Sequence, residues 1–245
     1  MSTVLSDVVV VGGGVAGLSA ATFTARHGLD TLVVDAGGSI LRRNAHLENF
    51  PGFPAGVNAR QLLDLLGEQA ESAGCERVED TVVRVDETDE SGFTVETEAG
   101  ERYRTEYVVA ATKNEVGYLD GVDGVGIIDR GKAFVDVDER GRTGVEGLYA
   151  AGRLAEKPHQ AVVCAGHGAE VGVTILEDDD RPFYHDWVAP EGYFTDRGRD
   201  LPPGCEEIDE EERERRESNS LTVMQDRFAE PHPDEQETHP SVGNE

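Results

Sequence analysis

The chain has 245 residues, with 50 Asp and Glu against 22 Lys and Arg, and its formal net charge is −28. A surface this acidic disfavours nucleic acids and anionic membranes as partners, because both repel negative charge. The length allows one or two domains, and no apolar segment approaches the roughly 20 residues of a membrane-spanning helix.

The acids are spread through the chain, and its only lysines are Lys113, Lys132 and Lys157. This balance predicts a halophilic cytoplasmic protein, since high salt screens the self-repulsion of such a charge. The three cysteines form no Cys-x-x-Cys pair, which disfavours disulfides and a built-in redox dithiol. No spacing of histidines or cysteines indicates a metal site, so none is expected.

The strongest motif runs from Val8 to Asp35 and reads VVVVGGGVAGLSAATFTARHGLDTLVVD. This order predicts a strand, a glycine turn, a helix and a second strand. Gly12 permits the tight turn, Gly14 lets a pyrophosphate approach the backbone, and Gly17 brings the helix close to the sheet. Asp35 ends the second strand, where its carboxylate can accept hydrogen bonds from an adenosine ribose. The motif therefore predicts a dinucleotide site, without deciding which dinucleotide it holds.

The next elements begin with a stiff loop rich in Pro, Gly and aromatic residues at 47–54. Asn58 then caps a helix that Gly74 ends. The apolar run 107–112 predicts a buried parallel strand. Before it, three short alternating segments predict a β-meander at 81–85, 93–97 and 102–105.

Residues 113–131 form a connection rich in glycine and acids. After it, short strands are expected at 133–136 and 148–152, a small-residue helix at 160–176 and a charged helix at 206–217. We expect a domain at residues 1–177, a partly helical extension at 178–230 packed on it through Trp187 and neighbouring aromatic residues, and a disordered acidic tail at 231–245.

Laid out in this order, the sequence resembles the flavin domain of the thioredoxin reductase-like family of pyridine nucleotide-disulfide oxidoreductases. The matching segments are GGGVAG at 12–17, ENFPGFP at 48–54, VVAAT at 108–112, GVEGLYAAG at 144–152 and KPHQAVVCAGHGA at 157–169. The resemblance implies an α/β fold, a single Rossmann-like FAD-binding domain with a parallel sheet, helices and a three-stranded β-meander, followed by the acidic C-terminal extension.

The resemblance also implies that FAD is the cofactor and binds in an extended form. The glycine turn would hold the pyrophosphate, Asp35 the adenosine ribose, the meander at Val82 the adenine, and Gly152 the ribityl chain. The amides that open the later helix at 159–161 would face the flavin edge, where a helix N-terminus stabilises negative charge on reduced flavin. The expected cofactor-binding residues are Gly12, Gly13, Gly14, Val15, Ala16, Gly17, Asp35, Ala36, Ser39, Asn49, Val82, Thr112, Gly152, Arg153, His159, Gln160 and Ala161.

Three features depart from the family pattern. Between the strand ending at Thr112 and the strand near Phe134, the family inserts a domain that binds the nicotinamide cofactor and carries the catalytic Cys-x-x-Cys. Here the interval is about 20 residues, shorter than the ~30 residues of a βαβ unit. Lys113 replaces the glycine of the family's A-T-G, and Arg153 replaces the aspartate of its A-G-D. Arg153 either pairs with the pyrophosphate or points to solvent at a decayed site.

Two residues near the expected flavin edge are candidates for catalysis. His159 could accept or donate a proton. Cys164 is either a small buried cysteine that behaves as a hydrophobe or a reactive thiol beside the flavin. His167 is expected to be a helix-surface or packing residue.

These inferences predict an FAD-dependent oxidoreductase whose reduced flavin passes electrons to an unidentified acceptor, without its own Cys-x-x-Cys or a separate NADPH domain. Its partner would be a small-molecule or protein redox partner, and a homodimer is an open alternative. Two other functions stay open. One is a non-catalytic FAD-binding or regulatory protein that has lost the redox chemistry, and the other is an enzyme whose flavin is reduced directly by NADH.

Overall fold

The computed structural model describes residues 4–89, 91–239 and 242. The chain divides into two compact units, Met1–Asp178 with Gln236–Glu245, and Asp179–Glu235. Within the described residues, no helix is both long enough and apolar enough to cross a membrane.

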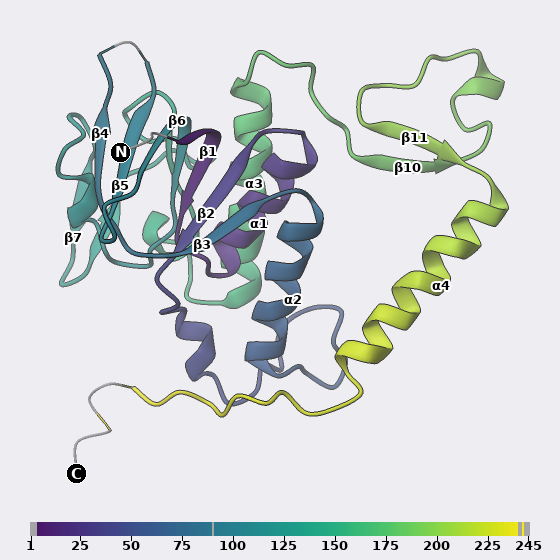
Figure 1. Ribbon diagram of the computed structural model, residues 1–245, viewed down its shortest axis with the longest axis horizontal. Helices are drawn as coiled ribbons and strands as arrows, with labels where there is room; N and C mark the ends of the chain where they lie inside the picture. The colour runs from purple at the N-terminus through teal and green to yellow at the C-terminus, as the bar shows by residue number, and fades with distance from the viewer. Residues whose placement is uncertain (1–3, 90, 240–241, 243–245) are drawn as a thin grey trace. The chain divides into compact units, whose positions relative to one another are not determined.

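A seven-stranded sheet organises the first unit (Figure 1). Five of its strands run parallel, in the order β3-β2-β1-β6-β9, and β5 and β4 continue the sheet from β6 in antiparallel pairing. The predicted α/β fold, with a parallel sheet and a meander, is confirmed. The strand bounds are β1 Val4–Val11, β2 Thr31–Asp35, β3 Glu76–Glu79, β4 Val82–Glu87, β5 Phe93–Thr97, β6 Arg102–Ala110 and β9 Leu148–Ala150.

Strand β6 is one continuous strand, whereas the sequence predicted two separate segments, 102–105 and 107–112. Along one edge, residues 102–105 pair antiparallel with β5, while residues 108–110 pair parallel with β9. Along the other edge, β6 pairs parallel with β1 from Tyr103 to Ala110. The division into two segments was wrong, because the continuous pairing with β1 keeps the backbone extended across the change of partner.

The sequence did not predict two further strands of the first unit, β3 and β7. The edge strand β3 reads ERVE and is mostly exposed, so it carries no alternating apolar signal. β7 (Ile127–Asp129) forms an antiparallel hairpin with β8 (Ala133–Val135), in which only β8 was expected. This hairpin lies in the interval between β6 and β9.

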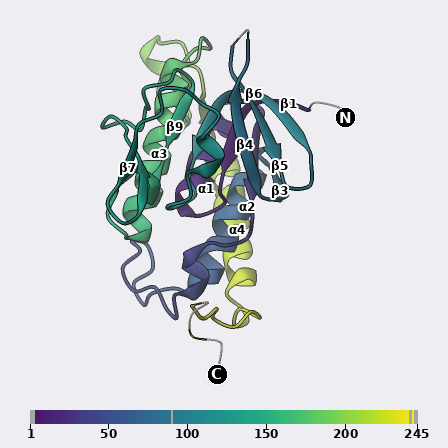
Figure 2. The same ribbon diagram turned by 90° about the vertical axis from the view of Figure 1, so that its left-hand side faces the viewer.

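Helices α1 (Val15–Arg26), α2 (Ala59–Ser72) and α3 (Ala161–Asp178) lie on one face of the parallel strands, as Figures 1 and 2 show. The α1 and α3 backbones approach closely because both helices are rich in small residues. A Cβ added at Gly168 of α3 would lie 2.0 Å from the Ala16 carbonyl oxygen of α1, and one added at Gly172 would lie 2.8 Å from Phe23 Cβ.

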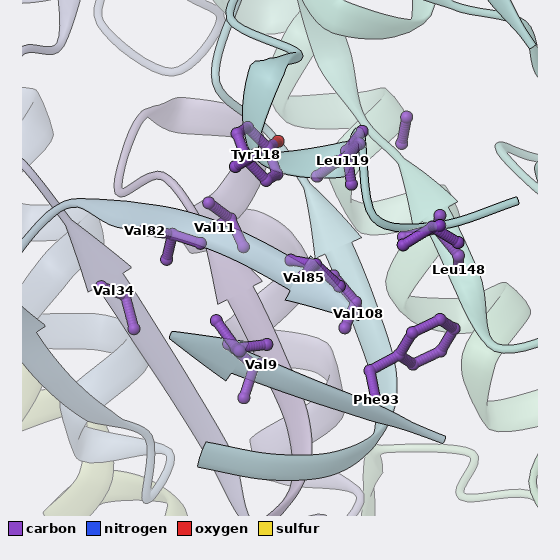
Figure 3. Close-up of a cluster of buried hydrophobic side chains, with 14 of the residues drawn as sticks. Val9, Val11, Val34, Val82, Val85, Phe93, Val108, Tyr118, Leu119 and Leu148 are labelled. Atoms are coloured by element: carbon purple, nitrogen blue, oxygen red, sulfur yellow. The ribbon is translucent and has the colours of Figure 1, made fainter. Parts of the chain in front are cut away.

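The other face of the sheet carries the main hydrophobic cluster, which the meander covers (Figure 3). Val9 and Val11 of β1 point into this cluster together with Val85 and Phe93 of the meander strands. Val10 faces the opposite side, where its side chain lies beside Gly17 of α1. The alternation follows from the two-residue period of a strand, and burial on both faces explains the all-valine sequence of β1.

In the second unit, β10 (Trp187–Pro190) pairs parallel with β11 (Cys205–Ile208), and α4 spans Glu210–Arg227. The helix expected at 206–217 therefore begins later and ends later than predicted. Residues 205–208 are taken up by strand pairing, and the Asp209 side chain caps the helix by accepting the Glu212 N–H at 2.8 Å.

The aromatic residues expected to anchor the extension pack on one another within the second unit. The Trp187 and Tyr193 ring centroids lie 4.7 Å apart, and Phe194 contacts both rings. Packing of the extension on the first unit stays a prediction. Of the expected disordered tail, residues 231–239 form no helix or strand, and residues 240, 241 and 243–245 lie outside the described residues.

Candidate functional site

A cavity of about 880 Å³ lies in the first unit, at the carboxyl ends of β1, β2 and β6 and the N-termini of α1 and α3. This volume is in the ~300–1,000 Å³ range of cofactor and small-molecule sites. Ligands of open α/β sheets bind at this edge, beside the strand ends. Sixteen residues that the sequence singled out line the cavity: Gly12, Gly13, Gly14, Val15, Ala16, Asp35, Ala36, Ser39, Asn49, Val82, Thr112, Arg153, His159, Gln160, Ala161 and Cys164.

Two of the expected cofactor residues, Gly17 and Gly152, do not line the cavity. A Cβ at Gly17 would lie 1.9 Å from the Gly12 carbonyl oxygen, so its absence lets α1 sit against the end of β1. Gly152 has a left-handed backbone with φ 63°, and a Cβ there would lie 2.6 Å from Ala16 Cβ. Both glycines therefore act through packing, by setting where α1 and the segment after β9 lie.

The glycine turn after β1 brings the Asp35 carboxylate beside the start of α1. Gly12 takes φ 110°, and a Cβ at Gly13 would lie 2.5 Å from Asp35 Oδ2. The motif spacing predicted this proximity, since adjacent parallel strands end at the same edge of the sheet.

The α1 N-terminus has no side-chain cap at Gly14, and its first turn has no acidic residue. The first backbone N–H groups of a helix lack intrahelical partners, and the helix dipole favours negative charge there. Val15 and Ala16 line the cavity. This end of the cavity is therefore suited to a phosphate.

The α3 N-terminus opens on the same cavity. The helix follows Gln160, whose carbonyl accepts the Cys164 N–H at 3.0 Å, and its first turn has no acidic residue. Asn49 Nδ2 donates to Gln160 Oε1 at 2.8 Å. This hydrogen bond ties the loop after β2 to the start of α3 across 111 residues of sequence.

The donor set fits an extended dinucleotide such as FAD. Two helix N-termini free of acids open on one cavity, which suits a diphosphate at one and an electron-rich ring edge at the other. The glycine turn lines the cavity, and the Asp35 carboxylate stands beside it. Within the residues that the structure describes, no group of three or more His, Cys, Asp or Glu side chains could hold a metal ion.

His159 is exposed at the edge of the cavity. Partial desolvation, followed by the positive charges of Lys113, Arg153 and Lys132, lowers the pKa of its imidazole below the usual value. This environment favours the neutral imidazole, in which one ring nitrogen can accept a proton.

Cys164 is buried, and its Sγ lies 3.5 Å from the Pro158 carbonyl oxygen. Burial raises the pKa of the Cys164 thiol. Because the thiolate is the reactive form, this environment favours a packed thiol over a nucleophile.

Arg153 does not point freely to solvent. Its Cζ lies 4.6 Å from the centroid of the Phe134 ring, and its Nη1 donates to the Lys157 carbonyl at 3.1 Å. The guanidinium also lines the cavity, so it remains available to an anion there.

His167 is the residue that holds the backbone after β9. It is buried, and its Nδ1 accepts the Gly152 N–H at 3.0 Å. Burial, followed by the charge of Lys157, lowers the pKa of His167 to about 4. The sequence left a surface or a packing position open, and the structure gives a buried one.

The sequence reasoning missed several residues that line the cavity: Arg43, Asn44, Leu47, Asp80, Thr81, Asn114 and Tyr118. Lys113, which the sequence marked only as a departure from the family pattern, also lines the cavity. Tyr118 is buried, and its hydroxyl lies 2.9 Å from Thr112 Oγ1. Asp80 and Thr81 could have been found from their position next to Val82. Arg43 and Tyr118 have no such signal, because they come from short 3₁₀ helices, Ile40–Arg43 and Gly117–Leu119, that only the fold brings to the cavity.

Residues 6–112 match the family model described as pyridine nucleotide-disulphide oxidoreductase. The chain is 39% identical over 113 residues to a thioredoxin reductase of Streptomyces coelicolor, covering 44% of this chain and 34% of that protein. It is 34% identical over 118 residues to a thioredoxin reductase of Rickettsia felis, covering 47% and 38%. In sequence, the chain thus spans little more than a third of the length of these curated relatives.

Solved structures show the same fold. A thioredoxin reductase from Gloeobacter violaceus superposes with a TM-score of 0.64 at 19% identity, covering 76% of this chain and 100% of that chain. The thioredoxin reductase from Streptococcus pyogenes superposes with a TM-score of 0.64 at 14% identity, covering 72% and 98%.

Proposed function

From the premise that this chain carries a thioredoxin reductase-like FAD-binding domain, we propose that it is an FAD-dependent oxidoreductase. It would pass electrons from a diffusible donor to a diffusible acceptor. Bound FAD supplies the redox chemistry. The sequence contains no Cys-x-x-Cys. The regular elements of the interval from Lys113 to Lys132 are a short 3₁₀ helix at Gly117–Leu119 and strand β7. Donor and acceptor would therefore both come from outside these residues.

The observation that carries this proposal is the pair of acid-free helix N-termini that open on one cavity. The α1 amides would bind the diphosphate, and Asp35 beside the glycine turn would accept hydrogen bonds from the adenosine ribose. The hydrogen bond from Asn49 to Gln160 orients the start of α3. These residues support binding and orientation of the cofactor by this chain.

His159 is the residue we propose for proton handling. It is exposed at the edge of the cavity, and its lowered pKa favours the neutral imidazole. We give Cys164 no catalytic role, because burial raises the pKa of its thiol. A histidine that exchanges protons with solvent suits an oxidoreductase that has no dithiol of its own.

An anaerobic reduction titration of the FAD-loaded protein in molar salt tests this proposal. We expect flavin absorbance on reconstitution, bleaching by a physiological donor, and recovery of absorbance with an added quinone or oxygen. Bleaching by NADH or NADPH would identify direct reduction by a nicotinamide. Reduction by dithionite alone, with no turnover, would favour a non-catalytic FAD-binding protein, and a protein that stays colourless would refute FAD binding.

A further inference from the structure

Four cations gather at the edge of the cavity where α3 begins. They are Arg43, Lys113, Lys132 and Arg153, called here the basic cluster. Three of them line the cavity, and Lys132 stands outside it on the β7–β8 turn, exposed. The cluster holds two of the three lysines of a chain with 50 acids.

None of these four cations has a carboxylate at ion-pair distance among the described residues. By contrast, Arg130 on the same β7–β8 turn as Lys132 is paired, with its Nη1 3.1 Å from Glu156 Oε1. In a protein with more than two acids per base, unpaired cations that gather in one place are not the expected outcome. Their mutual repulsion is a cost that a bound anion would offset.

Specific contacts hold together the segments that carry three of these cations, Lys113, Lys132 and Arg153. Asn114 Nδ2 donates to the Ala133 carbonyl at 3.1 Å, which brings the loop after β6 to the β7–β8 hairpin. Lys113 and Lys132 are the residues immediately before these two. Arg153 stacks on Phe134, the residue after Ala133. Three separate segments therefore deliver their cations to one place through contacts of neighbouring residues.

The backbone at Lys113 indicates that the position of this cation is specified. Lys113 takes φ 68°, the left-handed conformation that favours glycine. A residue with a Cβ is strained in this conformation. Burial, followed by the positive charges of Arg43 and Lys132, lowers the pKa of Lys113, and Glu115 only partly opposes this. The chain thus accepts both backbone strain and charge repulsion at one residue.

We propose that the basic cluster, together with the exposed His159, binds a small anionic substrate that carries phosphate or several carboxylates, at the same time as the cofactor. The proposal rests on the proposed function and names the substrate class of that site. A cofactor diphosphate alone does not account for the cluster, because the α1 N-terminus already suits it and the positive charge extends beyond the cavity to Lys132.

The test is calorimetric titration of the FAD-free and the FAD-loaded protein with inorganic pyrophosphate and, separately, with citrate, at constant ionic strength in chloride. The two probes distinguish phosphate from carboxylate chemistry. We expect at least one of them to bind the FAD-loaded protein. The double variant Lys113→Gly and Lys132→Gln should bind it at least about tenfold more weakly, which corresponds to about 1.4 kcal/mol.

Matched variants separate binding from folding. Lys113→Gly places the residue best suited to a left-handed backbone there, so a loss of binding cannot be assigned to strain. Arg130→Gln removes one positive charge from the same hairpin at a residue already paired with Glu156, and it should change the affinity less than twofold. In the NMR titration of His159, the bound anion should raise the pKa of its imidazole.

Three outcomes would overturn the inference. These are equal affinity in the double variant and the wild type, no binding of either probe to the FAD-loaded protein, and binding to the FAD-free protein that FAD abolishes. The last would assign the cluster to the cofactor phosphates. Failure to take up FAD, read from flavin absorbance, would refute the proposed function instead, and the FAD-free titration would still decide whether the cluster binds anions.

Discussion

The contact between α1 and α3 places both helix N-termini at the cavity, and one methyl group should disturb it. A Cβ added at Gly168 would lie 2.0 Å from the Ala16 carbonyl oxygen, whereas ordinary van der Waals contact begins near 3.4 Å. The neighbour is backbone, so no side-chain rotation relieves the clash. In the Gly168→Ala variant, the helices must therefore move apart by more than about 1 Å.

The size of the effect follows from two opposing terms. Overpacking of a close contact costs roughly 1–3 kcal/mol, and we place this one at the upper end because the neighbour is backbone. Alanine in place of a helical glycine returns up to about 1 kcal/mol. We expect Gly168→Ala to lower the free energy of unfolding by roughly 2 kcal/mol and Tm by about 4–8 °C. FAD affinity should fall as well, because both N-termini shift.

Gly166 provides the matched control on the same helix. It is exposed, and a Cβ there would meet nothing within 4 Å. Gly166→Ala should therefore stabilise the protein by about 0.5–1 kcal/mol through helix propensity alone. Urea unfolding and FAD titration of both variants give the comparison. If Gly168→Ala were as stable as Gly166→Ala and bound FAD equally well, the close contact would not set the cavity geometry.

Three further results are expected. The pKa of His167 is lowered to about 4, so between pH 6.5 and about 4 the unfolded chain binds a proton that the folded chain does not. In this range the free energy of unfolding should rise with pH more steeply for the wild type than for His167→Asn. Equal slopes in urea unfolding would contradict this. Asn58 Oδ1 accepts hydrogen bonds from the Arg60 and Gln61 N–H groups that open α2. Asn58→Ala should therefore lower the free energy of unfolding by about 1 kcal/mol, whereas Asn58→Ser should leave it nearly unchanged. Iodoacetamide should label Cys205 faster than the buried Cys164 in the native protein, and equal rates by mass spectrometry would show that the α3 N-terminus opens readily.

The sequence alone determined the start of the fold and the core of the cavity. The strand, glycine turn, helix and second strand from β1 to β2 follow from patterns within 28 residues, so local propensity and burial agree there. The position of Asp35 beside Gly13 then follows from the geometry of adjacent parallel strands, without knowledge of the rest of the chain.

Only the tertiary structure decided the features that depend on distant partners. Strand β6 is one strand because β1 pairs along its whole edge, although its sequence suggests two segments. The bond between Gly152 and His167 and the approach of Gly168 to Ala16 join segments whose own patterns do not specify one another. The basic cluster is of the same kind, since a local pattern reports burial and periodicity but not which loops the sheet brings together.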